Sequence, residues 1–190
     1  MTDTSESDEA LLARYARGDA HAFAPLYARH ELRVWRYLLR NVGNRASAEE
    51  LMQEVWFAVA RDAASYQPTA RFTSWLFTIA RNRLIDLVRT RREHSSLEAL
   101  GYDSEPLVGR LASDPARGPH AALEAHEAAA ALGSALGQLP QEQRDAFLLQ
   151  MEGDFSVEEI AAITRSSFET TKSRLRYARA RLRELLTEHV

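Results

Sequence analysis

The segment from 72 to 92 constrains the fold most, because its residues FTSWLFTIARNRLIDLVRTRR separate into two faces of a helix. At about 100° per residue, most of the apolar side chains fall on one broad arc, as a core-packing helix requires. This arc holds Phe72, Leu76, Ile79, Ala80, Leu84, Leu87 and Val88. The opposite arc is polar and basic, with Thr78, Arg81, Asn82, Asp86, Arg89 and Arg92, and Trp75 lies at its edge.

Guanidinium groups beside a large aromatic ring suit a polyanion that also offers flat rings, which describes nucleic acid with exposed bases. The alternative is a solvated basic face on which Trp75 merely covers the core, because charged helix faces usually meet only solvent. This segment alone leaves both interpretations open.

The composition excludes several classes of function. The 190 residues suffice for one ordinary domain or two small ones. The absence of cysteine excludes disulfides, thiolate metal sites and a catalytic thiol, and the six histidines are scattered. We therefore expect no catalytic residues, no metal site and no cofactor. No apolar run approaches the roughly 20 residues of a membrane span, and the acidic start MTDTSESDEA is unlike a secretory signal, so we expect a cytoplasmic protein.

Charge and texture predict an all-α protein of two small helical domains. The net charge of −3 conceals segregation, since arginines gather at the ends of two helices while acids gather elsewhere. Residues 94–120 are rich in glycine, proline and acids, which predicts a flexible acidic linker that stays off DNA. The predicted helical domains are 8–93 and 121–190, and the second ends in a helix-turn-helix.

A second amphipathic helix is predicted from 48 to about 61, opened by a capping box with Ser47 at the cap. Its core stripe holds Ala48, Leu51, Met52, Val55 and Val59. Its reverse side carries Glu49, Glu50, Gln53, Glu54 and Phe57. An apolar anchor within an acidic surround indicates a protein-binding surface. A tolerated exposed phenylalanine is the alternative, because single surface apolar residues are common.

The last two predicted helices have the proportions of a helix-turn-helix. A capping box at 156–159 opens the first helix, Arg165 lies in the connection, and the final helix runs from 168 to about 186. Its core side is predicted to hold Phe168, Leu175, Ala178, Leu182, Leu185 and Leu186. Base-edge and phosphate contacts are expected from Glu169, Thr170, Ser173, Arg176 and Tyr177, flanked by Lys172, Arg174 and Arg181. A charged helix packed on a bundle is the alternative.

The strings SAEELMQEVW, FTSWLFTIARNRLIDLVRTRR and FSVEEIAAITRSSFETTKSRLRYARARLRE, in this order, resemble the bacterial RNA polymerase sigma factors. The resemblance is strongest to the small two-domain extracytoplasmic-function (ECF) class and covers about 8 to 186. It implies a factor that is not an enzyme and that binds core RNA polymerase through the β′ clamp helices and the β flap. Promoter DNA is the second implied partner, and an anti-sigma protein a third, with no membrane insertion.

The resemblance also implies residue roles. Polymerase binding falls to Glu49, Glu50, Gln53, Glu54 and Phe57. Melting at the minus-ten element, with capture of a flipped base, falls to Tyr66, Phe72 and Trp75, while Arg81, Asn82, Arg89 and Arg92 hold the strand. The helix-turn-helix reads the minus-thirty-five element with Arg165, Glu169, Thr170, Lys172, Ser173, Arg174, Arg176 and Tyr177.

The chain departs from the family pattern in the turn of the helix-turn-helix. Arg165 and Ser166 stand where glycine and an apolar residue are common, and Thr171 replaces a buried Val or Ile. The turn is therefore looser, or Arg165 has become a phosphate contact. Ser47 also replaces a frequent aspartate, so one charge of the polymerase interface is absent.

Two other functions compete with a sigma factor. A repressor or activator would use the helix-turn-helix and dimerise through the N-terminal helices, but it leaves the surface from Glu49 to Phe57 without a task. A helical metal-dependent nuclease would need convergent carboxylates or histidines, and the glutamates of this surface lack a histidine on the same helix.

Overall fold

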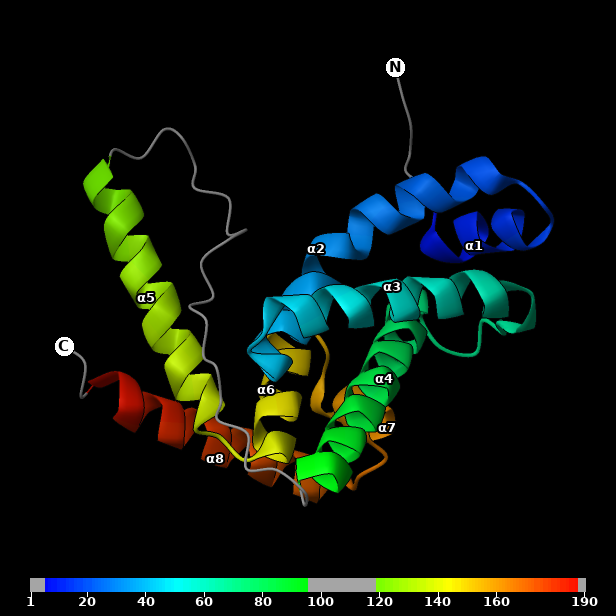
Figure 1. Cartoon of the computed structure of the whole chain (residues 1–190). Coiled ribbons are helices and arrows are strands. Elements are labelled where there is room, and N and C mark those ends of the chain that lie inside the picture. Colours follow the sequence, from blue (N-terminus) through cyan, green and yellow to red (C-terminus); the bar gives the residue numbers. More distant parts are fainter. Residues whose placement is uncertain (1–5, 96–118, 188–190) are drawn as a thin grey trace.

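The computed structural model describes residues 6–95 and 119–187, and every regular element within them is a helix (Figure 1). The predicted all-α fold is confirmed. None of the described helices has the length and hydropathy that crossing a bilayer requires. In chain order the elements are α1 (Asp8–Ala16), η1 (Ala20–Ala22), α2 (Phe23–Val42), α3 (Arg45–Asp62), η2 (Ala63–Ser65), α4 (Phe72–Ser95), α5 (Pro119–Gly137), α6 (Gln141–Gly153), α7 (Val157–Thr164) and α8 (Phe168–Thr187).

Local sequence explains where the N-terminal helices begin and end. Asp19 caps the 3-10 helix η1 by accepting a hydrogen bond from the His21 backbone N–H at 3.1 Å. Helix α2 then starts at Phe23 and carries Pro25 in its first turn, where a missing N–H costs nothing. It ends at Val42, and its C-cap Gly43 has a φ of +66°, the left-handed conformation that glycine tolerates best.

The C-terminal helices pack directly on the N-terminal ones. Helix α6 lies against α2 and α4, and α7 lies against α4 (Figure 1). Phe155, between α6 and α7, is 2% exposed, and its ring meets that of Phe77 on α4 edge to face at 5.2 Å. The described helices therefore share one apolar core. Most of the predicted linker at 94–120 lies outside the described residues, between Ser95 and Pro119.

The predicted core stripes are largely confirmed. On α4, Phe72, Leu76, Ala80 and Leu84 are fully buried, whereas Ile79, Leu87 and Val88 are partly buried against the core. The periodicity missed Phe77, which is 1% exposed because α7 and its preceding loop cover a second side of α4. On α8, Leu175, Ala178, Leu182 and Leu185 are buried, and Leu186 is partly buried.

Candidate functional site

Helix α3 presents the acidic surface that the sequence predicts, but it begins earlier. Asn44 is the N-cap, in an extended conformation, and its side-chain oxygen accepts from the Ser47 backbone N–H at 3.0 Å. The predicted capping box at Ser47 is therefore wrong, since this residue lies within the first turn and is only 8% exposed. Its hydroxyl instead accepts from the Arg91 guanidinium and donates to Asn44.

We call Glu49, Glu50, Gln53, Glu54 and Phe57 the acidic face, and all five are exposed. Phe57 is 71% exposed, while Leu51, Val55 and Val59 on the opposite side are buried. Only Glu49 in this face makes a described ion pair, to Arg45 at 2.9 Å, and both partners are half exposed. A ring this open beside carboxylates contributes little to the fold, so the face is available to a partner.

The loop before α4 brings together two of the three predicted aromatic residues. Tyr66 and Trp75 are both partly buried, with ring centroids 5.0 Å apart, and we call them the aromatic pair. The Tyr66 hydroxyl donates to the carbonyl of Ala70 at 2.8 Å, which closes the loop on itself. Burial raises the pKa of this phenol above its ordinary value, so it remains a donor at neutral pH.

Phe72 is the exception, because it is fully buried. Its ring lies 6.0 Å from Trp75 and 6.5 Å from Tyr66, underneath the aromatic pair. The prediction that Phe72 receives a base is therefore wrong for this structure, since the core already covers both of its faces. Phe72 supports the aromatic pair instead.

The basic arc of α4 is only partly open. Asn82 and Arg89 are exposed, and Arg89 makes one loose ion pair with Asp86 at 3.4 Å. The side chain of Arg92 lies outside the described side chains. Arg81 does not lie on a solvated face, because its side chain is 14% exposed and its Nε donates to Asp145 of α6 at 2.7 Å.

Asp145 is the centre of a buried polar network that local sequence patterns did not reveal. It is 3% exposed, and its other oxygen accepts from the Tyr37 hydroxyl at 2.6 Å. Burial, then the negative charge of Asp145, raises the pKa of Tyr37 well above its ordinary value. Arg81, Tyr37 and Asp145 come from α4, α2 and α6 and are separated by 64 and 108 positions, so only the tertiary fold brings them together.

A second set of contacts joins α2 to the end of α6. The Arg33 Nε donates to the backbone carbonyl of Glu152 at 2.7 Å, and Arg40 pairs with the Glu152 carboxylate. Burial raises the pKa of Glu152 more than Arg40 lowers it. Arg33, Tyr37 and Arg40 recur at i, i+4 and i+7, so one side of α2 is committed to α6.

The helix-turn-helix is formed by α7 and α8. The capping box is confirmed, because the Ser156 hydroxyl accepts from the Glu159 N–H at 3.2 Å while the Glu159 carboxylate accepts from the Ser156 N–H at 2.9 Å. Arg165 ends α7 with a φ of +53°, and its N–H bonds back to the carbonyls of α7. The backbone thus takes the left-handed shape that glycine tolerates best, but with an arginine side chain exposed at the turn.

Hydroxyl groups replace apolar packing inside this turn. Thr171 is fully buried, and its Oγ1 lies 2.8 Å from the Ser166 hydroxyl. Ser166 lies 2.9 Å from the Thr164 hydroxyl, which donates to the carbonyl of Ile160 at 2.7 Å. Of the two alternatives that the sequence leaves open for this turn, the looser turn is not observed, since a continuous chain of hydrogen bonds satisfies the buried polar atoms.

The outer face of α8 is open, as predicted. The prediction that Phe168 faces the core is wrong, because this side chain lies at the first position of α8 and is 41% exposed. Tyr177 is 54% exposed, and Arg176 stacks over its ring with the guanidinium carbon 4.9 Å from the centroid. Glu169, Thr170, Lys172 and Arg176 are exposed, while Ser173 and Arg174 are partly exposed.

Among the described residues, no three metal-ligating side chains converge on one point. The three surfaces are instead the acidic face of α3, the aromatic pair with the open part of α4, and the outer face of α8. Each offers charge, hydrogen-bonding groups or rings for a macromolecular partner.

Comparison with known proteins identifies the two halves of the chain. Residues 26–94 match the family model for sigma-70 region 2, and residues 129–182 match a model for sigma-70 region 4. The RNA polymerase sigma factor CarQ of Myxococcus xanthus is 34% identical over 93% of this chain and 96% of its own length. The ECF RNA polymerase sigma factor RpoE of Cereibacter sphaeroides is 35% identical over 97% of this chain and 98% of its own.

Two solved structures are similar over most of the chain. RpoE from Bartonella quintana, in complex with the anti-sigma factor NepR, aligns with a TM-score of 0.72 and 25% identity over 87% of this chain and 96% of that one. CnrH, in complex with the cytosolic domain of CnrY, aligns with a TM-score of 0.69 and 25% identity over 97% of this chain and 100% of that one.

Proposed function

This chain belongs to the ECF sigma factors and acts in transcription initiation, and we propose that it directs core RNA polymerase to promoters through three separate surfaces. The acidic face of α3 binds the polymerase. The aromatic pair with α4 opens the minus-ten element, and α8 reads the minus-thirty-five element. The proposed modules are residues 8–93 and 121–190, joined by 94–120, and they work in the cytoplasm. The exposed Phe57 within its carboxylate surround carries the proposal, because the fold gives it no internal role.

The acidic face is proposed to dock on the β′ clamp helices. Charge reversal at Glu50 and Glu54 places two cations opposite a basic partner, which repel it. Both side chains are exposed, so we expect the fold to be preserved. We expect Glu50→Lys with Glu54→Lys to abolish co-purification with core polymerase, and Phe57→Ala to weaken it. Glu31→Lys, at an exposed position of α2, is the charge control. Unchanged association of the double variant would contradict the assignment.

The aromatic pair is proposed to receive a base flipped from the non-template strand. Flipping costs a few kcal/mol, which stacking on a ring offsets by about 1–3 kcal/mol per base. Asn82, Arg89 and Arg92 are proposed to hold the strand, and Arg81 joins them only when Asp145 releases it. Trp75→Ala is expected to slow strand opening, measured by permanganate reactivity, while polymerase binding is unchanged. Equal activity on duplex and pre-melted promoters would argue against this role.

The outer face of α8 is proposed to enter the major groove. Glu169, Thr170 and Ser173 lie near its N-terminal end and are proposed to reach base edges. Phosphate contacts are proposed for Arg165, Lys172, Arg174, Arg176 and Tyr177. Arg176→Ala is expected to lower promoter binding by holoenzyme about equally for all promoter sequences, as loss of a phosphate contact does. A change of sequence preference would assign Arg176 to base reading instead.

The two DNA surfaces gain from presentation together on the polymerase, which raises their effective concentration. Footprinting of promoter DNA without polymerase distinguishes this proposal from a repressor. A repressor would protect duplex DNA as the free chain, whereas the proposed sigma factor would not. We also propose that an anti-sigma protein binds this chain, since RpoE of Bartonella quintana is solved with its anti-sigma factor.

A further inference from the structure

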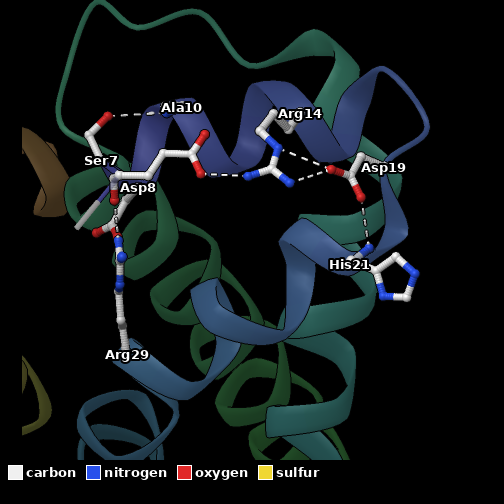
Figure 2. Close-up of polar contacts among 8 residues, drawn as sticks. Ser7, Asp8, Ala10, Arg14, Asp19, His21 and Arg29 are labelled. Atoms are coloured by element: carbon white, nitrogen blue, oxygen red, sulfur yellow. Dashed lines mark hydrogen bonds and ion pairs between the residues drawn. The ribbon is translucent and has the colours of Figure 1, made fainter. Parts of the chain in front are cut away.

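Helix α1 lies outside the two segments that match the family models, since the first match begins at residue 26 within α2. It is nevertheless firmly attached. Asp8 bonds to Arg29 at 2.9 Å, and Arg14 bonds to Asp19 (Figure 2). Asp8 also bonds to the His30 ring at 2.6 Å. The attachment holds α1 against α2 and η2. These polar contacts add to the burial of Leu11 and Leu12, so α1 is held in place by more than its apolar packing.

Glu9 links α1 to the start of α4. Its Oε1 accepts a hydrogen bond from the backbone N–H of Phe72 at 2.9 Å. Phe72 is the first residue of α4, and the first N–H groups of any helix lack an internal acceptor. The first turn of α4 contains no acidic residue, and the side chain of Arg71 before it offers only donors. Glu9 therefore supplies, from another helix, the carboxylate cap that α4 lacks.

The capped end of α4 is the end that carries the aromatic pair. Phe72 lies beneath Trp75 and Tyr66, and the His30 ring, held by Asp8, lies 5.4 Å from the Phe72 ring. Helix α1 thus braces Phe72 at its backbone through Glu9 and at its ring through His30. The charge of Glu9 also adds to burial in raising the pKa of Tyr66, which places the carboxylate close to the phenol.

We propose that α1 is a positioning element for strand opening, in which the hydrogen bond from Phe72 to Glu9 fixes the start of α4 and so the aromatic pair. The inference rests on the proposed function of that pair. Glu9 acts through Phe72 and not on DNA, because a carboxylate facing a phosphate would repel it. Its reach to the Phe72 N–H, more than its charge, is what positions the pair.

Two conservative variants separate reach from charge. Glu9→Gln keeps an oxygen at the same distance and loses the charge, while Glu9→Asp keeps the charge and is one methylene too short. In kinetics with holoenzyme on a duplex promoter, we expect Glu9→Asp to slow the isomerisation to the open complex about tenfold with the initial binding constant unchanged. Glu9→Gln should retain a rate within about threefold of the parent. Glu6→Ala is the control, since its carboxylate contacts Arg14 and not α4.

A Trp75→Ala background distinguishes the two levels of the proposal. If Glu9 acts through the aromatic pair, Glu9→Asp adds no further slowing there. If Trp75→Ala alone leaves isomerisation unchanged, the role of the pair fails. If Trp75→Ala slows isomerisation while Glu9→Asp does not, the positioning role of Glu9 is overturned. Equal slowing by Glu9→Gln and Glu9→Asp overturns it as well. A changed affinity of Glu9→Asp for core polymerase also overturns it.

Discussion

The contact between the two halves of the chain makes a quantitative prediction, because two ion pairs of nearly equal length cross it at different depths. Arg81 and Asp145 are 2.7 Å apart with side chains 14% and 4% exposed. Arg71 and Glu159 are 2.6 Å apart with side chains 58% and 31% exposed. The lengths are matched, so burial decides which pair contributes to stability.

Removing Asp145 leaves the Arg81 guanidinium without its carboxylate and the Tyr37 hydroxyl without its acceptor, both away from water. Breaking a buried pair in this way costs about 3–5 kcal/mol. Removing Arg71 affects an exposed pair, which contributes less than about 1 kcal/mol. We expect Asp145→Ala to lower the free energy of unfolding by about 3–5 kcal/mol and Arg71→Ala by less than about 1 kcal/mol.

Urea unfolding followed by circular dichroism measures both variants. A double-mutant cycle with Arg81→Ala then isolates the pair, with an expected coupling of about 2–3 kcal/mol. Equal losses for Asp145→Ala and Arg71→Ala, or no coupling in the cycle, would refute the reasoning that burial makes the deeper pair hold the halves together.

Three further predictions concern stability. Arg165→Gly relieves a left-handed residue and should raise the free energy of unfolding by about 1 kcal/mol, while a filter-binding assay of holoenzyme on promoter DNA should show weaker binding if the arginine contacts phosphate. Gly153→Ala places a Cβ 2.1 Å from the Phe155 ring and should destabilise by about 1–3 kcal/mol in thermal unfolding. Because the pKa of Tyr37 is raised in the folded chain, its stabilising contribution is complete below about pH 10 and is lost as pH rises further, so Tyr37→Phe should flatten the alkaline part of a stability curve.

Periodicity within one helix predicted the surfaces well. The acidic face, the buried stripe of α3 and the exposed side of α8 each follow from side chains spaced three and four apart, and these spacings are fixed by helix geometry. Helix ends were predicted less well. Asn44 and Ser47 are both good capping residues three positions apart, and periodicity does not choose between them.

What the sequence did not predict depends on packing between distant segments. Arg81 lies on the polar arc of α4, but that arc turns out to face Asp145, which is 64 positions away. Periodicity placed Phe72 on the buried arc of α4, as the structure does, but only the position of its ring under Trp75 shows that it supports the aromatic pair and does not receive a base. Glu9 gave no signal of its own, because its partner is a backbone N–H, which every residue but proline carries.

The shared core has a consequence for anyone who isolates one half of this protein. Phe155 covers the Phe77 ring, so a fragment that ends at Ser95 would expose this apolar ring beside Tyr37. Such a fragment should self-associate or aggregate unless the C-terminal half is co-expressed.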